Sequence, residues 1–313
     1  MPKSSVVSIG FRVCRCRESI AERRSPSFIG GDRLVSGFLS CAVVYHCMKD
    51  ALEEIQFLAN SANRVRVLNA LTGESATRRD LQEETGVPRS TAARVLDEAE
   101  ARGWVDSAGS RYTITPLGEA RVAEFRTYVE TTKGMRHLGE AIDWLPEPVH
   151  VLDFRHFRDA TVTTPTEGNP TAPFDRGLEL IRAADEYRGL TRNSLPRYMK
   201  TVRDRVVRGQ LDFEGVIERR FVEVLRDDPE RAARWQDVAH RTWLYDGHVP
   251  INMHVLGGTT LIWLCDEDRD GDGVIVKGLL ESDHPAVVSW AESFYEEYRD
   301  QAEPLHREML PSE

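Results

Sequence analysis

The sequence predicts a mixed α+β protein with two folded parts, residues 48–133 and residues 134–313. In the first part, short helical patterns flank a Gly-containing turn and are followed by a two-stranded hairpin. In the second part, β-branched runs alternate with amphipathic helical runs, which is the order of an α/β domain. Hydrophobic residues make up 41% of the chain, which is sufficient for a core.

Composition excludes two classes of protein. The least polar stretch, residues 35–47, is too short and too mixed to span a bilayer, so we expect no integral membrane protein. Five cysteines, four of them before residue 48, are an odd and uneven set for a disulfide framework. We therefore expect a reducing, cytoplasmic location.

The charge distribution limits how the chain could bind a polyanion. The net charge is -10, and residues 48–133 hold 12 basic and 14 acidic side chains. A bulk-acidic protein binds nucleic acid only through a local patch. Five lysines stand against 36 arginines, a composition that resembles haloarchaeal proteins, although a GC-rich genome alone also favours arginine.

Residues 1–47 differ from the rest because they are basic and lack helical or strand periodicity. Their cysteines (Cys14, Cys16, Cys41 and Cys47) do not have the spacing of common zinc sites, although zinc binding is the alternative. A periodic helical region begins at Met48. We therefore expect residues 1–47 to be disordered or an upstream start-codon extension.

Local signals define the first helices of the part at 48–133. Apolar residues recur at helical spacing from Ile55 to Leu71, and Gly73 ends that segment. Thr77 and Asp80 form a variant capping box that starts a short helix at 78–85, which Gly86 ends.

The next helix, residues 88–102, has two different faces. Pro88 suits a first helical position. One narrow face holds Ala92, Val95, Leu96 and Ala99, and the opposite face holds Ser90, Ala93, Arg94 and Asp97. Two helices joined by a tight turn make a helix-turn-helix, whose second helix enters the major groove of DNA.

A hairpin at residues 104–115 follows Gly103, with Gly109 in its loop, and is the expected wing. Residues 116–133 then read as an exit helix. The sequence therefore predicts an N-terminal winged helix-turn-helix.

Seven side chains are the predicted DNA contacts: Arg78, Arg79, Arg89, Ser90, Thr91, Arg94 and Arg111. Arginine reads guanine edges bidentately, and hydroxyls bind bases or phosphates. Each assignment has an alternative. Arg78 and Arg79 could be solvated residues of a first helical turn, and Arg94 could pair with Asp97 or Glu98. The tip of a wing, near which Arg111 lies, often does not contact DNA. The whole module could also serve protein–protein contacts.

This stretch resembles archaeal winged-helix transcription regulators, with helix, turn, helix, hairpin and exit helix in order. The matching residues are Leu58, Arg64, Val67, Leu68, Leu71, Arg78, Arg79, Asp80, Leu81, Gly86, Val87, Arg89, Ser90, Thr91, Arg94, Leu96, Arg102, Gly103, Trp104, Val105, Tyr112, Thr115, Pro116, Leu117 and Gly118. Pro88 departs from the pattern because relatives often have a hydroxyl cap there.

Residues 134–313 predict an α/β domain of a sensor type. Helical patterns cover residues 135–145, 176–187, 195–208, 213–226, 229–244 and 285–303. Strand patterns cover residues 160–164, 249–256, 259–265 and 274–280.

This part resembles the C-terminal region of haloarchaeal regulators in the methanogenesis-regulator (Fil-type) middle-domain group. The resemblance rests on Pro165, Gly209 before residues 213–216, the late hairpin, and residues 283–285 ahead of Trp290. It implies a homodimer that senses an unidentified small-molecule effector. The helices at 116–133 and 285–303 are the two candidates for the dimer contact.

Enzyme and metal chemistry are the weaker interpretations of residues 134–313. No His-x-Lys pair, Gly-x-Ser-x-Gly elbow, His-Glu-x-x-His or phosphate-binding loop occurs, so we expect no enzyme and no cofactor. Residues 266–271 (Asp266, Asp268, Asp270, Gly271) mimic an EF-hand start, but its twelfth position is Lys277. The set His240, His248, His254 and Cys265 matches no compact ligand spacing, and His254 or Asn252 could instead line an effector cavity.

The sequence thus favours a DNA-binding transcription regulator whose partner is double-stranded DNA. The alternative is an effector-binding or scaffold protein that keeps a vestigial helix-turn-helix.

Overall fold

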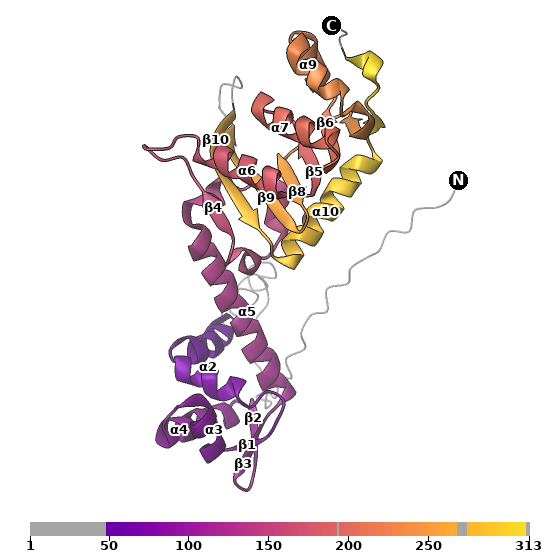
Figure 1. The fold of residues 1–313 in the computed structure, drawn as a ribbon. Coiled ribbons are helices and arrows are strands. Elements are labelled where there is room, and N and C mark those ends of the chain that lie inside the picture. The colour runs from indigo at the N-terminus through magenta and orange to yellow at the C-terminus, as the bar shows by residue number, and fades with distance from the viewer. Residues whose placement is uncertain (1–47, 193, 268–273, 311–313) are drawn as a thin grey trace, which may run out of the picture. The chain divides into compact units, whose positions relative to one another are not determined.

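The computed structural model describes residues 48–192, 194–267 and 274–310 (Figure 1). The chain divides into two compact units, residues 1–60 and 61–313. The described part of the first unit is a helix at residues 48–59. The expectations for residues 1–47 and for Asp268, Asp270 and Gly271 lie outside the described residues. Among the helices that are described, none is both long and apolar enough to cross a membrane.

The second unit begins with a helix-turn-helix and a three-stranded antiparallel sheet in the order β1-β3-β2. Its elements are α2 (Ala62–Asn69), β1 (Ala76–Thr77), α3 (Arg78–Thr85), α4 (Arg89–Glu100), β2 (Val105–Ala108) and β3 (Arg111–Ile114). The strands β2 and β3 form the wing. This is the winged helix-turn-helix that the sequence predicts.

The turn between α3 and α4 forms where the local signals place it. The Thr77 hydroxyl accepts a hydrogen bond from the Asp80 N–H at 3.3 Å, and the Asp80 carboxylate accepts one from the Thr77 N–H at 2.9 Å. The bond from the Thr77 N–H to the carboxylate is the largest cause that holds the pKa of Asp80 below its usual value. Gly86 adopts φ 69°, a left-handed conformation that favours glycine, and its N–H closes α3 on Gln82. The capping box and the Gly86 stop are confirmed.

Helix α4 buries the predicted face. Ala92, Val95, Leu96 and Ala99 are each at most 2% exposed. Two details of the predicted helix at 88–102 are wrong. Pro88 is the N-cap, because its ψ of 141° is extended, and the helix ends at Glu100, where the chain turns into Gly103 with φ 69°.

Helix α5 (Pro116–Leu138) runs five residues beyond the predicted end at 133. Thr115 caps its start, and Gly139, with φ 54°, ends it. The predicted helix at 135–145 is therefore wrong as a separate element, since its second half is the 3-10 helix η1 (Gly139–Trp144). The domain boundary at 133/134 stays a prediction.

The rest of the unit is built on an eight-stranded sheet in the order β11-β7-β6-β5-β8-β9-β10-β4 (Figure 1). Strands β5, β6 and β7 are parallel, and the other neighbours are antiparallel. The strands are β4 (Thr161–Thr163), β5 (Glu186–Thr191), β6 (Asp212–Glu218), β7 (Thr242–Tyr245), β8 (Met253–Leu256), β9 (Thr259–Glu267), β10 (Val274–Ser282) and β11 (Glu303–Pro304).

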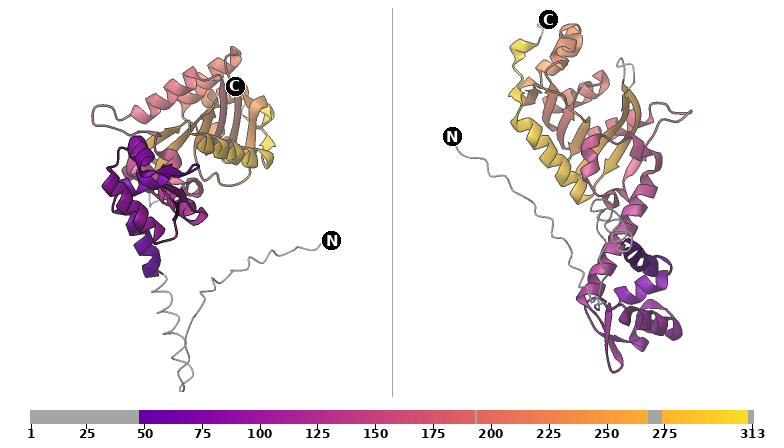
Figure 2. Two further views of the ribbon diagram at one scale, coloured as in Figure 1. Left: turned by 90° about the horizontal axis from the view of Figure 1, so that it is seen from below. Right: turned by 180° about the vertical axis from the view of Figure 1, so that it is seen from behind.

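Helices cover both faces of this sheet and give it two cores (Figure 2). One core lies under α6 (Ala172–Ala183), α7 (Pro196–Val207), α8 (Phe221–Arg226) and α9 (Pro229–Gln236). The other lies under α10 (Pro285–Asp300), η1 and the 3-10 helices η2 (Glu147–Val151) and η3 (Phe154–Phe157). Strand β6 contributes to both, because Phe213 and Ile217 face the first core and Val216 the second.

Besides the helix at 135–145, four predicted helices of this part are wrong in type or extent. The helix predicted at 285–303 is α10, which ends at Asp300 before β11. Residues 213–226 form strand β6 and then the short α8, because a central parallel strand buried on both faces has no alternating pattern. The helix predicted at 176–187 is α6, which begins and ends earlier and leaves 186–187 to β5. The helix predicted at 229–244 ends at Gln236, before η4 (Ala239–Arg241) and β7.

Candidate nucleic-acid interface and C-terminal cavity

The outer face of α4 carries two arginines without internal partners. Arg89, Ser90 and Arg94 are exposed, and Thr91 is half-buried. Within the described residues, no hydrogen bond or ion pair is recorded for the side chains of Arg89 and Arg94. Both guanidinium groups therefore keep all their donors available to a ligand.

The acidic neighbours of Arg94 are bound by other arginines. The Asp97 carboxylate pairs with Arg78 at 3.3 Å, and the Glu98 carboxylate pairs with Arg64 at 2.6 Å. Both partners come from other helices, α3 and α2. The alternative in which Arg94 pairs with Asp97 or Glu98 along its own helix is therefore not the arrangement found.

The two predicted contacts on α3 do hold internal partners. Arg79 pairs with Glu83 at 2.8 Å, one turn along the helix. Besides its contact with Asp97, Arg78 lies 5.3 Å from the centre of the Tyr112 ring. Exposed ion pairs of this kind contribute little free energy, so they could be exchanged for phosphate contacts at small cost.

Arg111 on β3 is held by the loop before β1. Its Nε donates to the Ser75 hydroxyl at 2.9 Å, and its second guanidinium nitrogen donates to the Ser75 carbonyl at 2.7 Å. The side chain thus has a structural task in fixing the wing against β1. Its role as a DNA contact stays a prediction, as do those of the other six side chains.

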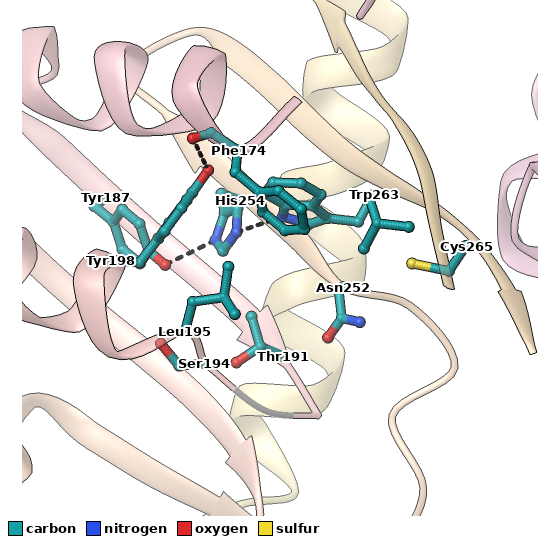
Figure 3. Close-up of a pocket in the computed structure, with 11 residues that line it drawn as sticks. Phe174, Tyr187, Thr191, Ser194, Leu195, Tyr198, Asn252, His254, Trp263 and Cys265 are labelled. Carbon is teal, nitrogen blue, oxygen red and sulfur yellow. Dashed lines mark hydrogen bonds between the residues drawn. The ribbon is translucent and has the colours of Figure 1, made fainter. Parts of the chain in front are cut away.

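A cavity of about 200 Å³ lies between α6, α7 and the sheet (Figure 3). It is lined by Phe174, Tyr187, Thr191, Ser194, Leu195, Tyr198, Asn252, His254, Trp263, Cys265 and Val276. Asn252 and His254, the two residues expected to line a cavity, are among them.

His254 lies at the centre of a buried chain of hydrogen bonds. The Trp263 indole N–H donates to His254 Nε2 at 3.0 Å, and His254 Nδ1 lies 2.8 Å from the Tyr187 hydroxyl (Figure 3). Because an indole N–H only donates, Nε2 must accept, so the proton of the neutral ring is on Nδ1 and is donated to Tyr187. Burial lowers the pKa of His254 to about 4, so the ring is neutral at pH 7.

The side chains considered as metal ligands do not gather in one place. Both ring nitrogens of His254 are engaged as above, and His248 Nδ1 lies 3.2 Å from Glu218. Over the part of the chain that the structure describes, no three His, Cys, Asp or Glu side chains are arranged to hold a metal ion.

The sequence does not reveal Tyr187, Trp263 and Phe174 as cavity residues. Phe174 and Tyr187 lie in or beside a stretch predicted as one continuous helix, and Trp263 is an ordinary strand residue. The only available signal is the alternation along residues 251–255, which places His254 opposite Met253 and Val255.

Two family models match the chain. Residues 52–136 match the HVO_A0261 N-terminal domain, and residues 170–301 match the middle domain of the methanogenesis regulatory protein FilR1. The two matches cover 85 and 132 of the 313 residues, each less than half of the chain. The matches confirm both resemblances, and with the winged helix-turn-helix they support, in general terms, a regulator that binds DNA. No curated protein matches the chain.

Solved structures show only weak similarity. The archaeal chromatin protein TrmBL2, described with a novel mode of DNA binding, is 12% identical, with 80% of this chain and 98% of that chain covered and a TM-score of 0.35. The phospholipase D family member Nuc from Salmonella typhimurium is 16% identical, with 46% and 95% covered and a TM-score of 0.34. BpsR from Bordetella bronchiseptica, whose DNA binding is regulated by 6-hydroxynicotinic acid, is 21% identical, with 33% and 79% covered and a TM-score of 0.22. TM-scores below 0.5 do not establish a shared fold for the whole chain.

Proposed function

We propose that the protein is a cytoplasmic, sequence-specific transcription regulator that binds double-stranded DNA as a homodimer. Helix α4, the predicted recognition helix at 88–102, enters the major groove, and the wing at 104–115 contacts the backbone or the minor groove. The part of the chain that matches the FilR1 middle domain senses a small-molecule effector and does not catalyse a reaction.

The observation that carries this proposal is the division of α4 into two faces. The apolar face is sealed in the core, while Arg89, Ser90 and Arg94 are presented outward at its N-terminal end. N-terminal residues of a recognition helix are those that reach base edges. Arginine can donate bidentately to guanine, and the Ser90 hydroxyl can bond a base or a phosphate.

Helix α5 is the better of the two candidates for the dimer contact. The apolar stripe of α10 is used inside the protein, since Val287 and Ala291 are fully buried. On α5, by contrast, Leu117, Tyr128 and Met135 are 49%, 66% and 41% exposed. Their spacing of eleven and seven residues places them on one stripe of a helix. A second copy of α5 would cover this stripe.

A genomic binding screen with the full chain tests the proposal. The parent should enrich a two-fold symmetric site with half-sites about 34 Å, one helical turn, apart. Arg89→Ala with Arg94→Ala should abolish the sequence preference, because two bidentate contacts are removed. Arg126→Ala on the exposed side of α5 is the matched control for loss of positive charge and should keep the preference.

Two outcomes would contradict the regulator. Absence of any enriched site in the parent would favour the alternative, a scaffold or effector-binding protein with a vestigial helix-turn-helix. Equal behaviour of the double variant and Arg126→Ala would show that α4 does not read the sequence.

We also propose that DNA binding depends weakly on salt, as suits a halophilic protein. Each protomer presents two arginines without internal partners on α4, and residues 48–133 carry more acidic than basic side chains. If only these four arginines of a dimer meet phosphates, while Arg78, Arg79 and Arg111 keep their internal partners, about −0.9 per neutralised phosphate gives a slope of log K against log salt near −4. Fluorescence anisotropy on the enriched site between moderate and molar salt measures this slope. A value near −8 would contradict the proposal.

A further inference from the structure

None of the described residues that line the C-terminal cavity carries a charge with which to meet a charged ligand. Its described lining consists of aromatic and aliphatic side chains, one thiol, one amide, three kinds of hydroxyl and the neutral His254. A charged ligand enclosed there would lose its hydration without gaining a counter-charge, which is strongly unfavourable. The cavity therefore selects uncharged molecules.

The hydrogen-bond arrangement leaves two donors of lining residues without a partner among the described residues. Because His254 Nδ1–H donates to the Tyr187 hydroxyl oxygen, the hydroxyl proton of Tyr187 is available, and the described residues provide no acceptor for it. The Asn252 side-chain oxygen accepts from the Arg192 N–H at 2.9 Å, which fixes the orientation of the amide. Its NH₂ group has no partner among the described residues and lies beside the cavity (Figure 3).

Aromatic rings form one wall of the cavity. Phe174 and Trp263 are stacked with their centroids 5.3 Å apart, and Tyr198 meets Trp263 edge-on at 5.8 Å. Tyr198 is itself fixed, because its hydroxyl donates to the Phe174 carbonyl at 2.5 Å. A planar ring gains favourable offset or edge contacts on such a wall. The volume of about 200 Å³ lies below the roughly 300–1,000 Å³ of pockets for drug-sized ligands, so the occupant is compact.

We propose that this cavity binds a small, uncharged aromatic or heteroaromatic carbonyl compound whose acceptor groups receive hydrogen bonds from the Tyr187 hydroxyl and the Asn252 amide. The proposal deepens the proposed function, on which it rests, since it assigns the effector a chemical class and a site.

Benzamide and benzoate are a suitable pair of probes because they share a ring and size and differ in charge. Ligand-observed NMR with the full chain should show saturable binding of benzamide with a Kd on the order of 1 mM, as expected for so small a ligand. Benzoate should bind at least about tenfold more weakly at pH 7.

Three variants test the site. Tyr187→Phe removes one donor and should weaken benzamide binding roughly three- to tenfold. Tyr245→Phe is the matched control: Tyr245 lies on β7 outside the cavity lining, and benzamide binding should not change. Leu195→Trp, at a position that is 41% exposed, should fill the cavity and abolish binding. Circular dichroism and the Tm of each variant establish that it is folded.

The inference is overturned if benzamide shows no saturable binding, if benzoate binds equally well, or if Tyr187→Phe and Tyr245→Phe behave alike. These results would leave an enriched DNA site, and hence the regulator, intact. Conversely, if the chain binds benzamide but enriches no DNA site, the proposal of a DNA-binding regulator is wrong, while the ligand site in the cavity is supported.

Discussion

Substitution of Gly118 by alanine is expected to lower the free energy of unfolding by at least about 2 kcal/mol. Gly118 is the third residue of α5 and is buried against the start of the wing. An added Cβ would overlap the carbonyl oxygen of Trp104 and lie 3.0 Å from Ile114 Cγ1. Overpacking against well-fixed groups costs about 3 kcal/mol, while the better helix propensity of alanine returns about 1 kcal/mol at most.

The Trp104 backbone cannot move away easily. Its carbonyl accepts a hydrogen bond from the Thr115 N–H, and its N–H donates to the Ala99 carbonyl at the end of α4, both at 2.9 Å. The Trp104 side chain is also 1% exposed. A shift at Gly118 would therefore be transmitted to α4, the proposed recognition helix, and DNA binding should fall together with stability.

Urea denaturation followed by circular dichroism measures the change in the full chain. Gly168→Ala is the matched control, because an added Cβ there meets no atom within 4 Å. Equal unfolding midpoints for the two alanine variants would show that the junction of wing and α5 tolerates a side chain and that its packing is looser than described.

The winged helix-turn-helix could be predicted because its signals are local. The capping box joins Thr77 to Asp80, and Gly86 supplies a left-handed turn within the same ten residues. The buried face of α4 follows from a spacing of three and four residues. Each signal acts within one or two turns of the chain, so a single sequence contains it completely.

The availability of Arg94 could not be predicted in this way. It depends on which cation binds Asp97 and which binds Glu98, and these are Arg78 and Arg64, 19 and 34 residues away. Sequence spacing alone favours the neighbour on the same helix. Only the packing of α2 and α3 against α4 determines that Arg78 and Arg64, rather than Arg94, pair with Asp97 and Glu98.

The cavity is harder to predict from local patterns, because its residues come from segments far apart in the sequence. Its buried hydrogen-bond chain comes from β5, β8 and β9, whose register places Gly189 opposite His254 and His254 opposite Leu261. The sequence does not predict strand β5, because Glu186 and Tyr187 continue the helical pattern of α6. The alternation along β8 was enough to predict His254 as a lining residue but not its partners.

Acidification from pH 6.5 to 4 is expected to remove about 3 kcal/mol of stability through His254 alone. The pKa of His254 is lowered from 6.5 to about 4 by burial, so over this interval the unfolded chain binds a proton that the native chain does not. Lower pH therefore favours unfolding, and the contribution is complete above pH 6.5. Protonation would also place an N–H at Nε2 against the Trp263 N–H, and no charged side chain among the described lining residues offsets the charge.

Comparison with His254→Gln isolates this contribution, because other groups titrate in the same range. Burial, followed by the nearby His284 and Arg155, lowers the pKa of His156 and gives a slope of the same sign. A glutamine can accept from Trp263 and donate to Tyr187 without titrating. Between pH 4 and 6.5 the unfolding free energy of the variant should rise less steeply than that of the parent, by at most about 1.4 kcal/mol per pH unit.

His240→Gln provides the control for this comparison, because it makes the same change of residue type at an exposed position on η4, outside the buried hydrogen-bond chain. If His254→Gln instead kept the full slope of the parent, His254 would titrate normally in the folded protein. The ring would then be hydrated and able to hold a positive charge near pH 6. In that case an anion could also bind in the cavity, and the protein should no longer prefer benzamide to benzoate. The pH profile and the probe pair therefore test the same physical property, the dryness of the site around His254, by independent measurements.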